Sequence, residues 1–226
     1  MAVPASKWVP RLFFLLLLLL AGTFLVSGDL VWVQGWVYFF VSATVQVADM
    51  WIVVGEAGLF EERTNPPKGG AAWDPILARF MVIVGSLSTL LVAALDHRFS
   101  WSQPLGDTVF AVGMILFVVG AVVGVWALAV NKWFSAIVRL QTDRGHKVVS
   151  SGPYSFVRHP SYLGAFLVFP AVAIILGSLY ALIPAVAGCV AVVIRASLED
   201  RFLHDNLEGY KEYAARVRSR LIPGIW

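Results

Sequence analysis

The stretch GHKVVSSGPYSFVRHPSYLG, residues 145–164, joins a polar loop that contains glycines directly to an apolar segment. Arg158, His159 and Pro160 form the junction. Proline suits the first turn of a helix, because its missing N–H has no partner there and its φ angle is already helical. We therefore predict that a helix begins at Pro160. Mostly apolar chain precedes this stretch, and an apolar hairpin and a charged tail follow it.

The composition indicates a membrane protein. Of the 226 residues, 59% are hydrophobic and only 14% are charged, which is more apolar surface than a soluble domain needs. The net charge of +3 includes no basic stripe of the kind that follows a phosphate backbone, so nucleic acid is not an expected partner. Cys189 is the only cysteine, and the 4 histidines form no HxxH or HxxxH pair. No disulfide framework and no metal site are therefore predicted.

We predict an all-α fold, an integral membrane helical bundle of about six transmembrane helices, each judged against the roughly 20 residues that cross a bilayer. Lys7, Arg11 and the run LFFLLLLLLAG also resemble a signal peptide, but the next span begins at Leu30, which favours an uncleaved first helix. The predicted spans are 12–27, 30–54, 76–95, 105–129, 160–176 and 179–194.

Basic residues predict the orientation of this multi-pass membrane protein. If residue 1 lies in the cytoplasm and the spans alternate, all 17 Lys and Arg residues except Arg98 fall on the cytoplasmic side. Such a distribution is typical of correctly placed transmembrane helices. The segments 55–75, 130–159 and the tail from Arg195 are then cytoplasmic, and every candidate functional residue is on that side. We interpret 55–75 as a connector.

The tail contains a predicted amphipathic helix. Tyr210, Tyr213, Ala214 and Val217 recur at i, i+3, i+4 and i+7, while charged residues occupy the other positions. Such a helix can lie on the membrane surface.

Two groups of polar residues are candidates for function. The free N–H groups of the first turn after Pro160, together with Arg158 and His159, can bind a carboxylate. The simpler interpretation is that Arg158 and His159 lie at the membrane interface and reach toward lipid phosphates. Arg195 and Glu199 are four residues apart and share a helix face. Pairing with each other would stabilise the helix by only about 0.3–0.5 kcal/mol. Alternatively, Glu199 binds a cationic or hydroxyl-bearing cofactor and Arg195 an anionic substrate.

The loop 145–164, the short hairpin, the pattern R-x-x-x-E-D of residues 195–200 and the helix GYKEYAARV together resemble the isoprenylcysteine carboxyl methyltransferase family and its phospholipid N-methyltransferase relatives. The resemblance covers residues 131–223. Residues 1–129 are then the N-terminal transmembrane helices that their apolar runs predict. Residues 130–226 then form a methyltransferase core with a cytoplasmic cofactor loop, a helical hairpin and a C-terminal cytoplasmic helix.

The resemblance implies an integral membrane enzyme that takes S-adenosylmethionine from the cytoplasm and a lipid-like acceptor from the bilayer. It assigns Arg195 to the acceptor, as the catalytic residue, and it places Asp200 where the family has a second glutamate. The cofactor-binding residues that it implies are Gln141, His146, Lys147, Val148, Val149, Tyr154, His159, Pro160, Ser161, Tyr162 and Glu199.

The acceptor is left open by the sequence. A carboxylate on an isoprenylcysteine-like thioether is favoured, because Arg195 offers a cation and no dedicated base is visible. A phosphatidylethanolamine amine and a small thiol are alternatives. Sterol reductases share a similar C-terminal pattern and use NADPH, but they are larger and have more spans. A transporter or a structural membrane protein would leave the cytoplasmic motif without a role.

Overall fold

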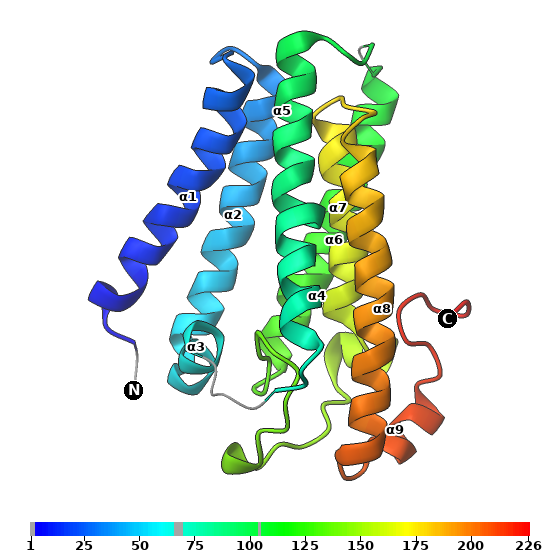
Figure 1. Cartoon of the computed structure of the whole chain (residues 1–226). Helices are drawn as coiled ribbons and strands as arrows, with labels where there is room; N and C mark the ends of the chain where they lie inside the picture. The colour runs from blue at the N-terminus through cyan, green and yellow to red at the C-terminus, as the bar shows by residue number, and fades with distance from the viewer. Residues whose placement is uncertain (1–2, 66–69, 104) are drawn as a thin grey trace.

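The computed structural model describes residues 3–65, 70–103 and 105–226, and in these ranges the regular structure is helical, with no strand. The long helices run side by side along one axis (Figure 1). The elements in chain order are α1 (Ala5–Ser27), α2 (Val33–Gly55), α3 (Ala57–Thr64), α4 (Asp74–Phe80), the π-helix η1 (Met81–Ser88), α5 (Thr89–Phe99), α6 (Asp107–Val130), the 3₁₀ turns η2 (Thr142–Arg144) and η3 (Gly152–Ser155), α7 (Pro160–Ile175), α8 (Leu182–Asn206) and α9 (Tyr210–Arg216).

Helices form at all six predicted spans. Five are long and apolar enough to cross a membrane. They are α1, α2, α6, α8 and one continuous helix that consists of α4, η1 and α5. The sixth, α7, is apolar but has only 16 residues. The chain is thus a multi-pass membrane protein, and the predicted all-α membrane bundle is confirmed. The short helix α3 lies in a segment that the sequence indicated only as a connector.

Glycines bring α6 and α7 into backbone contact. A Cβ atom on Gly164 would lie 2.6 Å from the carbonyl oxygen of Gly120, and one on Gly120 would lie 2.8 Å from the carbonyl oxygen of Gly164. Only glycine permits this approach, since real Cβ atoms essentially never come so close. The start of α7 is therefore fixed against α6, and the loop 131–159 that joins them folds back over the end of this pair (Figure 1).

A second close contact places the third membrane helix beside α8. A Cβ atom on Gly188 of α8 would lie 2.5 Å from the Cα atom of Gly85, which belongs to η1. A π-helical turn carries an extra residue and is often found near functional sites. Because α4 continues into η1 without a break, this contact also holds α4 beside the lower half of α8.

The C-terminal helix α9 packs on protein. Tyr210 and Tyr213 are 3% and 1% exposed, and they form a buried cluster with Tyr154 and Ala127. The predicted amphipathic helix therefore exists, but its apolar face contacts the loop and the end of α6 instead of lipid. The expectation that this face lies on the membrane is wrong, because the tyrosines find buried partners within the chain.

Candidate active site

A pocket opens where α6 ends and α7 begins, beside the part of α8 that extends past both. Figure 1 shows these three elements at the lower end of the bundle. It encloses about 870 Å³ free of protein atoms, part of which is open to solvent. Ten of the predicted site residues line it, namely His146, Lys147, Val148, Val149, Tyr154, His159, Ser161, Tyr162, Arg195 and Glu199. Residues as far apart in sequence as His146 and Glu199 thus meet around one cavity. Gln141 and Pro160 are not among its lining residues.

Gln141 stabilises the loop 131–159 through hydrogen bonds to other residues of that loop. Its side chain is fully buried, its Nε2 donates to the carbonyl of Trp133 at 2.6 Å, and its Oε1 accepts from Nη1 of Arg144 at 2.6 Å. The backbone N–H of Gln141 also donates to Nδ1 of His146 at 3.4 Å. All these bonds are internal, so Gln141 shapes the wall of the pocket from behind.

Pro160 begins α7, as predicted, and is buried. The N–H groups of the two residues before it are not free, because Arg158 donates to the carbonyl of Ser219 at 3.0 Å and His159 to that of Arg220 at 2.9 Å. Arg158 is only 8% exposed, and its Nη1 donates to two further carbonyls of the tail. The interpretation of Arg158 as a cation that reaches toward lipid phosphates is therefore wrong, because its guanidinium is buried and bonded within the chain. The C-terminal tail occupies this position instead.

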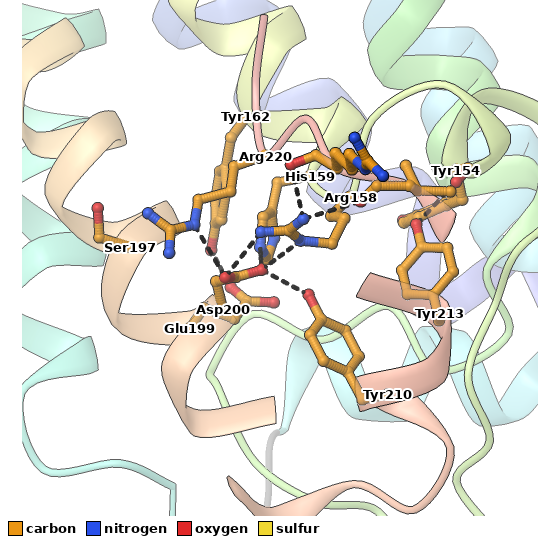
Figure 2. A network of polar contacts seen from close by, with 12 residues as sticks. Tyr154, Arg158, His159, Tyr162, Ser197, Glu199, Asp200, Tyr210, Tyr213 and Arg220 are labelled. Atoms are coloured by element: carbon orange, nitrogen blue, oxygen red, sulfur yellow. Dashed lines mark hydrogen bonds and ion pairs between the residues drawn. The ribbon is translucent and has the colours of Figure 1, made fainter. Parts of the chain in front are cut away.

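Asp200 lies at the centre of a buried polar cluster, on which the dashed lines in Figure 2 converge. Its carboxylate accepts from Nε and Nη2 of Arg158 at 2.7 and 3.0 Å, from Nε of Arg220 at 2.9 Å and from the hydroxyl of Tyr210 at 2.9 Å. Nε2 of His159 lies 3.3 Å away. We call these five residues the Asp200 cluster. It joins the start of α7, the end of α8, α9 and the tail, a role that the sequence did not reveal.

Glu199 points into the pocket from the same turn of α8 (Figure 2). The hydroxyl of Tyr162 donates to its Oε2 in a short hydrogen bond. In the described part of the chain, no other side chain or N–H group donates to this carboxylate. The remaining lone pairs of Glu199 are therefore available to a ligand.

Arg195 does not pair with Glu199. Its Nε and Nη2 donate to the carboxylate of Asp74 at 2.6 and 3.1 Å, and its guanidinium lies 5.4 Å from the ring centre of Tyr162. Nη2 also donates to the carbonyl of Ala136 at 3.2 Å. Asp74 is the first residue of α4 and is completely buried. Sequence reasoning missed it, because an aspartate before a proline at the start of an apolar span looks like an ordinary helix start.

A second carboxylate from the N-terminal half also holds the loop. Glu62 of α3 accepts from Nε and Nη2 of Arg139 at 2.8 and 2.6 Å and from the hydroxyl of Ser135 at 2.7 Å. The hydrogen bonds from Arg139 keep the pKa of Glu62 below its ordinary value. The segment 55–75 is thus more than a connector, because it positions the loop that lines the pocket.

His146 is uncharged at neutral pH. Burial, together with the nearby positive charges of Arg139 and Arg144, lowers its pKa from 6.5 to about 4. Its ring stacks on Trp133, with ring centres 5.6 Å apart. This wall of the pocket therefore presents a neutral imidazole.

Residues 108–208 match the family model described as phospholipid methyltransferase. This segment, 101 of the 226 residues, is similar to that family. The resemblance to isoprenylcysteine carboxyl methyltransferases and their phospholipid relatives is thereby confirmed, and the protein is a membrane methyltransferase. No curated protein matches the chain.

The matched segment of the methyltransferase contains α6, the loop, α7 and α8. It excludes α3, α4, α9 and the tail. Four groups that support the pocket therefore come from outside the matched segment, namely Glu62, Asp74, Tyr210 and Arg220.

The chemistry of the pocket suits a cationic ligand. Glu199 offers a carboxylate with lone pairs to spare, and aromatic side chains, which attract cations, come from Tyr154, Tyr162 and Tyr213. Methyltransferases of this family generally use S-adenosylmethionine, whose sulfonium and ammonium groups are both positive. The residues present fit such a group. Among the described residues, no three His, Cys, Asp or Glu side chains are grouped so that they could hold a metal ion.

Proposed function

We propose that this methyltransferase transfers a methyl group from S-adenosylmethionine to an acceptor that enters from the bilayer. The observation that carries the proposal is the carboxylate of Glu199, which faces an aromatic pocket inside the family segment and has one internal hydrogen-bond donor among the described residues. A half-buried carboxylate with open lone pairs among aromatic side chains favours a cationic ligand, because both the charge and the rings attract positive groups.

In this proposal, Glu199 binds a positive group of the cofactor, and Tyr154 and Tyr162 pack beside it. The remaining predicted residues form the wall of the pocket, namely His146, Lys147, Val148, Val149, His159 and Ser161. Gln141 and Pro160 support that wall from the side away from the cavity.

When bound, S-adenosylmethionine supplies a methyl group that its positive sulfur has already activated. The protein mainly has to align donor and acceptor at roughly 3–3.5 Å and exclude water. The buried Tyr210 and Tyr213 close one side of the pocket against water.

We propose a carboxylate on an isoprenylcysteine-like lipid thioether as the acceptor, with Arg195 as the residue that orients it. Arg195 lines the pocket, and among the described residues no acceptor contacts its Nη1. A carboxylate with a pKa near 4 is ionised at neutral pH and needs no base. The Nε and Nη2 edge of Arg195 already holds Asp74, so Nη1 is the part that remains for this contact.

The amine of phosphatidylethanolamine is the second candidate. Two observations favour it, namely the description of the matching family and the neutralisation of Arg195 by Asp74. An amine must lose a proton before it attacks, and Glu199 and His159 are two groups in the pocket that could accept one. A small thiol is a third acceptor class.

The lability of the product separates these acceptors. Purified protein in vesicles that contain phosphatidylethanolamine receives methyl-labelled S-adenosylmethionine and a farnesylcysteine analogue. A methyl ester should release volatile labelled methanol in mild alkali, whereas an N-methyl or S-methyl product should not. Arg195→Gln should lose this signal. Label found only in alkali-stable phospholipid would contradict the carboxylate proposal and support the amine.

We propose further that the pocket faces the cytoplasm and that residues 130–226 are the catalytic core, braced by the helices of residues 1–129. The distribution of Lys and Arg supports this orientation. Gln103 and Ser151 are exposed at opposite ends of the bundle. In intact cells, an impermeant maleimide should label Gln103→Cys and not Ser151→Cys, and the wild-type protein, with its buried Cys189, is the control. The reverse pattern would overturn the orientation.

A further inference from the structure

Three charged side chains meet beside Tyr162, and their pairing is unexpected. Arg195 and Glu199 are four residues apart on α8, a spacing at which opposite charges normally pair. Instead, two nitrogens of Arg195 bind Asp74, and Glu199 accepts from Tyr162. The arginine is therefore held away from its neighbour on its own helix.

Asp74 is well placed to compete for Arg195. It is fully buried, and its Oδ2 also accepts the N–H of Val138 at 2.8 Å. The carboxylate is thus fixed between α4, α8 and the loop by two partners. A planar guanidinium gains two parallel hydrogen bonds from such a fixed carboxylate, which a flexible glutamate on the same helix matches poorly.

The net charge of Asp74, Arg195 and Glu199 together depends on the carboxylate of Asp74. Two carboxylates, Asp74 and Glu199, and one guanidinium, Arg195, give a net charge of −2 + 1 = −1 beside the pocket. Without the charge of Asp74 the sum would be zero, and Arg195 would have Glu199 as its nearest remaining carboxylate on α8. Glu199 would then be occupied.

We propose that Asp74 is a positioning residue that holds Arg195 away from Glu199 and so keeps the Glu199 carboxylate free for a positively charged cofactor. This inference rests on the proposed function. It places a determinant of cofactor binding in α4, outside the segment that matches the family. Asp74 acts through Arg195 and does not line the pocket.

Binding of S-adenosylmethionine, measured by calorimetry, tests the proposal. Asp74→Asn keeps the shape of the side chain, and we expect it to weaken binding by about tenfold or more, because a charge-assisted contact to Glu199 is lost. The double variant Asp74→Asn/Arg195→Gln should bind almost as tightly as the wild type, since it has no guanidinium to occupy Glu199 and its net charge is again −1. A purely structural role of Asp74 would not be rescued by removing Arg195.

Asp96→Asn is the matched control. Asp96 is also a buried carboxylate on the same continuous helix, but it binds Ser102 and Ser178 at the opposite end of the bundle. Its substitution should leave cofactor affinity unchanged. Equal affinity of Asp74→Asn and the wild type would overturn the proposal, and so would a double variant that binds no better than Asp74→Asn.

A measurement without ligand distinguishes this proposal from the proposed function. In thermal unfolding, Glu199→Gln should lower the melting temperature more in the Asp74→Asn background than in the wild type, because only there does it break a new pair with Arg195. Equal shifts in both backgrounds would contradict the role of Asp74. A wild-type protein that does not bind S-adenosylmethionine would contradict the proposed function, whatever the unfolding result.

Discussion

Asp200→Asn is expected to destabilise the protein by about 3–5 kcal/mol, the range found when one partner of a buried ion pair is removed. The side chains of Arg158 and Asp200 are each 7% exposed, so the substitution leaves a buried guanidinium without its counter-charge. Arg220 and Tyr210 lose their charged acceptor at the same time. Unfolding by chemical denaturant in mixed micelles measures the change.

Asp205→Asn is the control for this prediction. Asp205 lies on the same helix, its side chain is 64% exposed, and the one ion pair that it forms with described residues is a long contact of 3.7 Å with His204. We expect its substitution to change stability by less than about 0.5 kcal/mol. Similar effects of the two substitutions would show that the Asp200 cluster does not hold the tail in place.

Glu199→Gln should weaken binding of S-adenosylmethionine by roughly 10- to 150-fold. This range corresponds to the loss of a hydrogen bond to a charged group, which contributes about 1.5–3 kcal/mol. The amide keeps the size of the side chain and can still accept from Tyr162, so the fold should be retained. Calorimetry on the purified protein gives the affinity, and the melting temperature without ligand shows whether the fold is intact.

Glu208→Gln provides a matched comparison, because Glu208 is exposed just beyond the end of α8 and does not line the pocket. Its affinity for the cofactor should equal that of the wild type. If Glu199→Gln also binds normally, Glu199 is a surface carboxylate that only accepts from Tyr162, and the proposed cofactor site has to be abandoned.

The sequence predicted the elements that depend on local pattern. Six spans could be placed because each needs only a long apolar run, and the start of α7 was marked by Pro160. The residues of the loop 145–164 that line the pocket could be named because they form one contiguous motif.

The ion-pair partners of the charged side chains could not be predicted from local sequence patterns. Arg195 bonds to Asp74, 121 residues earlier, although Glu199 is four residues away, and Asp200 collects partners from three separate segments. Which of these carboxylates a guanidinium meets is decided by backbone contacts such as that between Gly85 and Gly188, which hold α4 beside α8. No pattern within one helix contains this information.

The distance in sequence between Asp74 and Arg195 also imposes an order on biosynthesis. At about 5–20 residues per second, roughly 6–24 seconds separate the synthesis of these two residues, which are 121 positions apart. During that interval the carboxylate has no guanidinium to neutralise it, and a lone charge is costly to bury. The complete burial of a charged Asp74 side chain is therefore expected only after α8 has been made and has packed against α4.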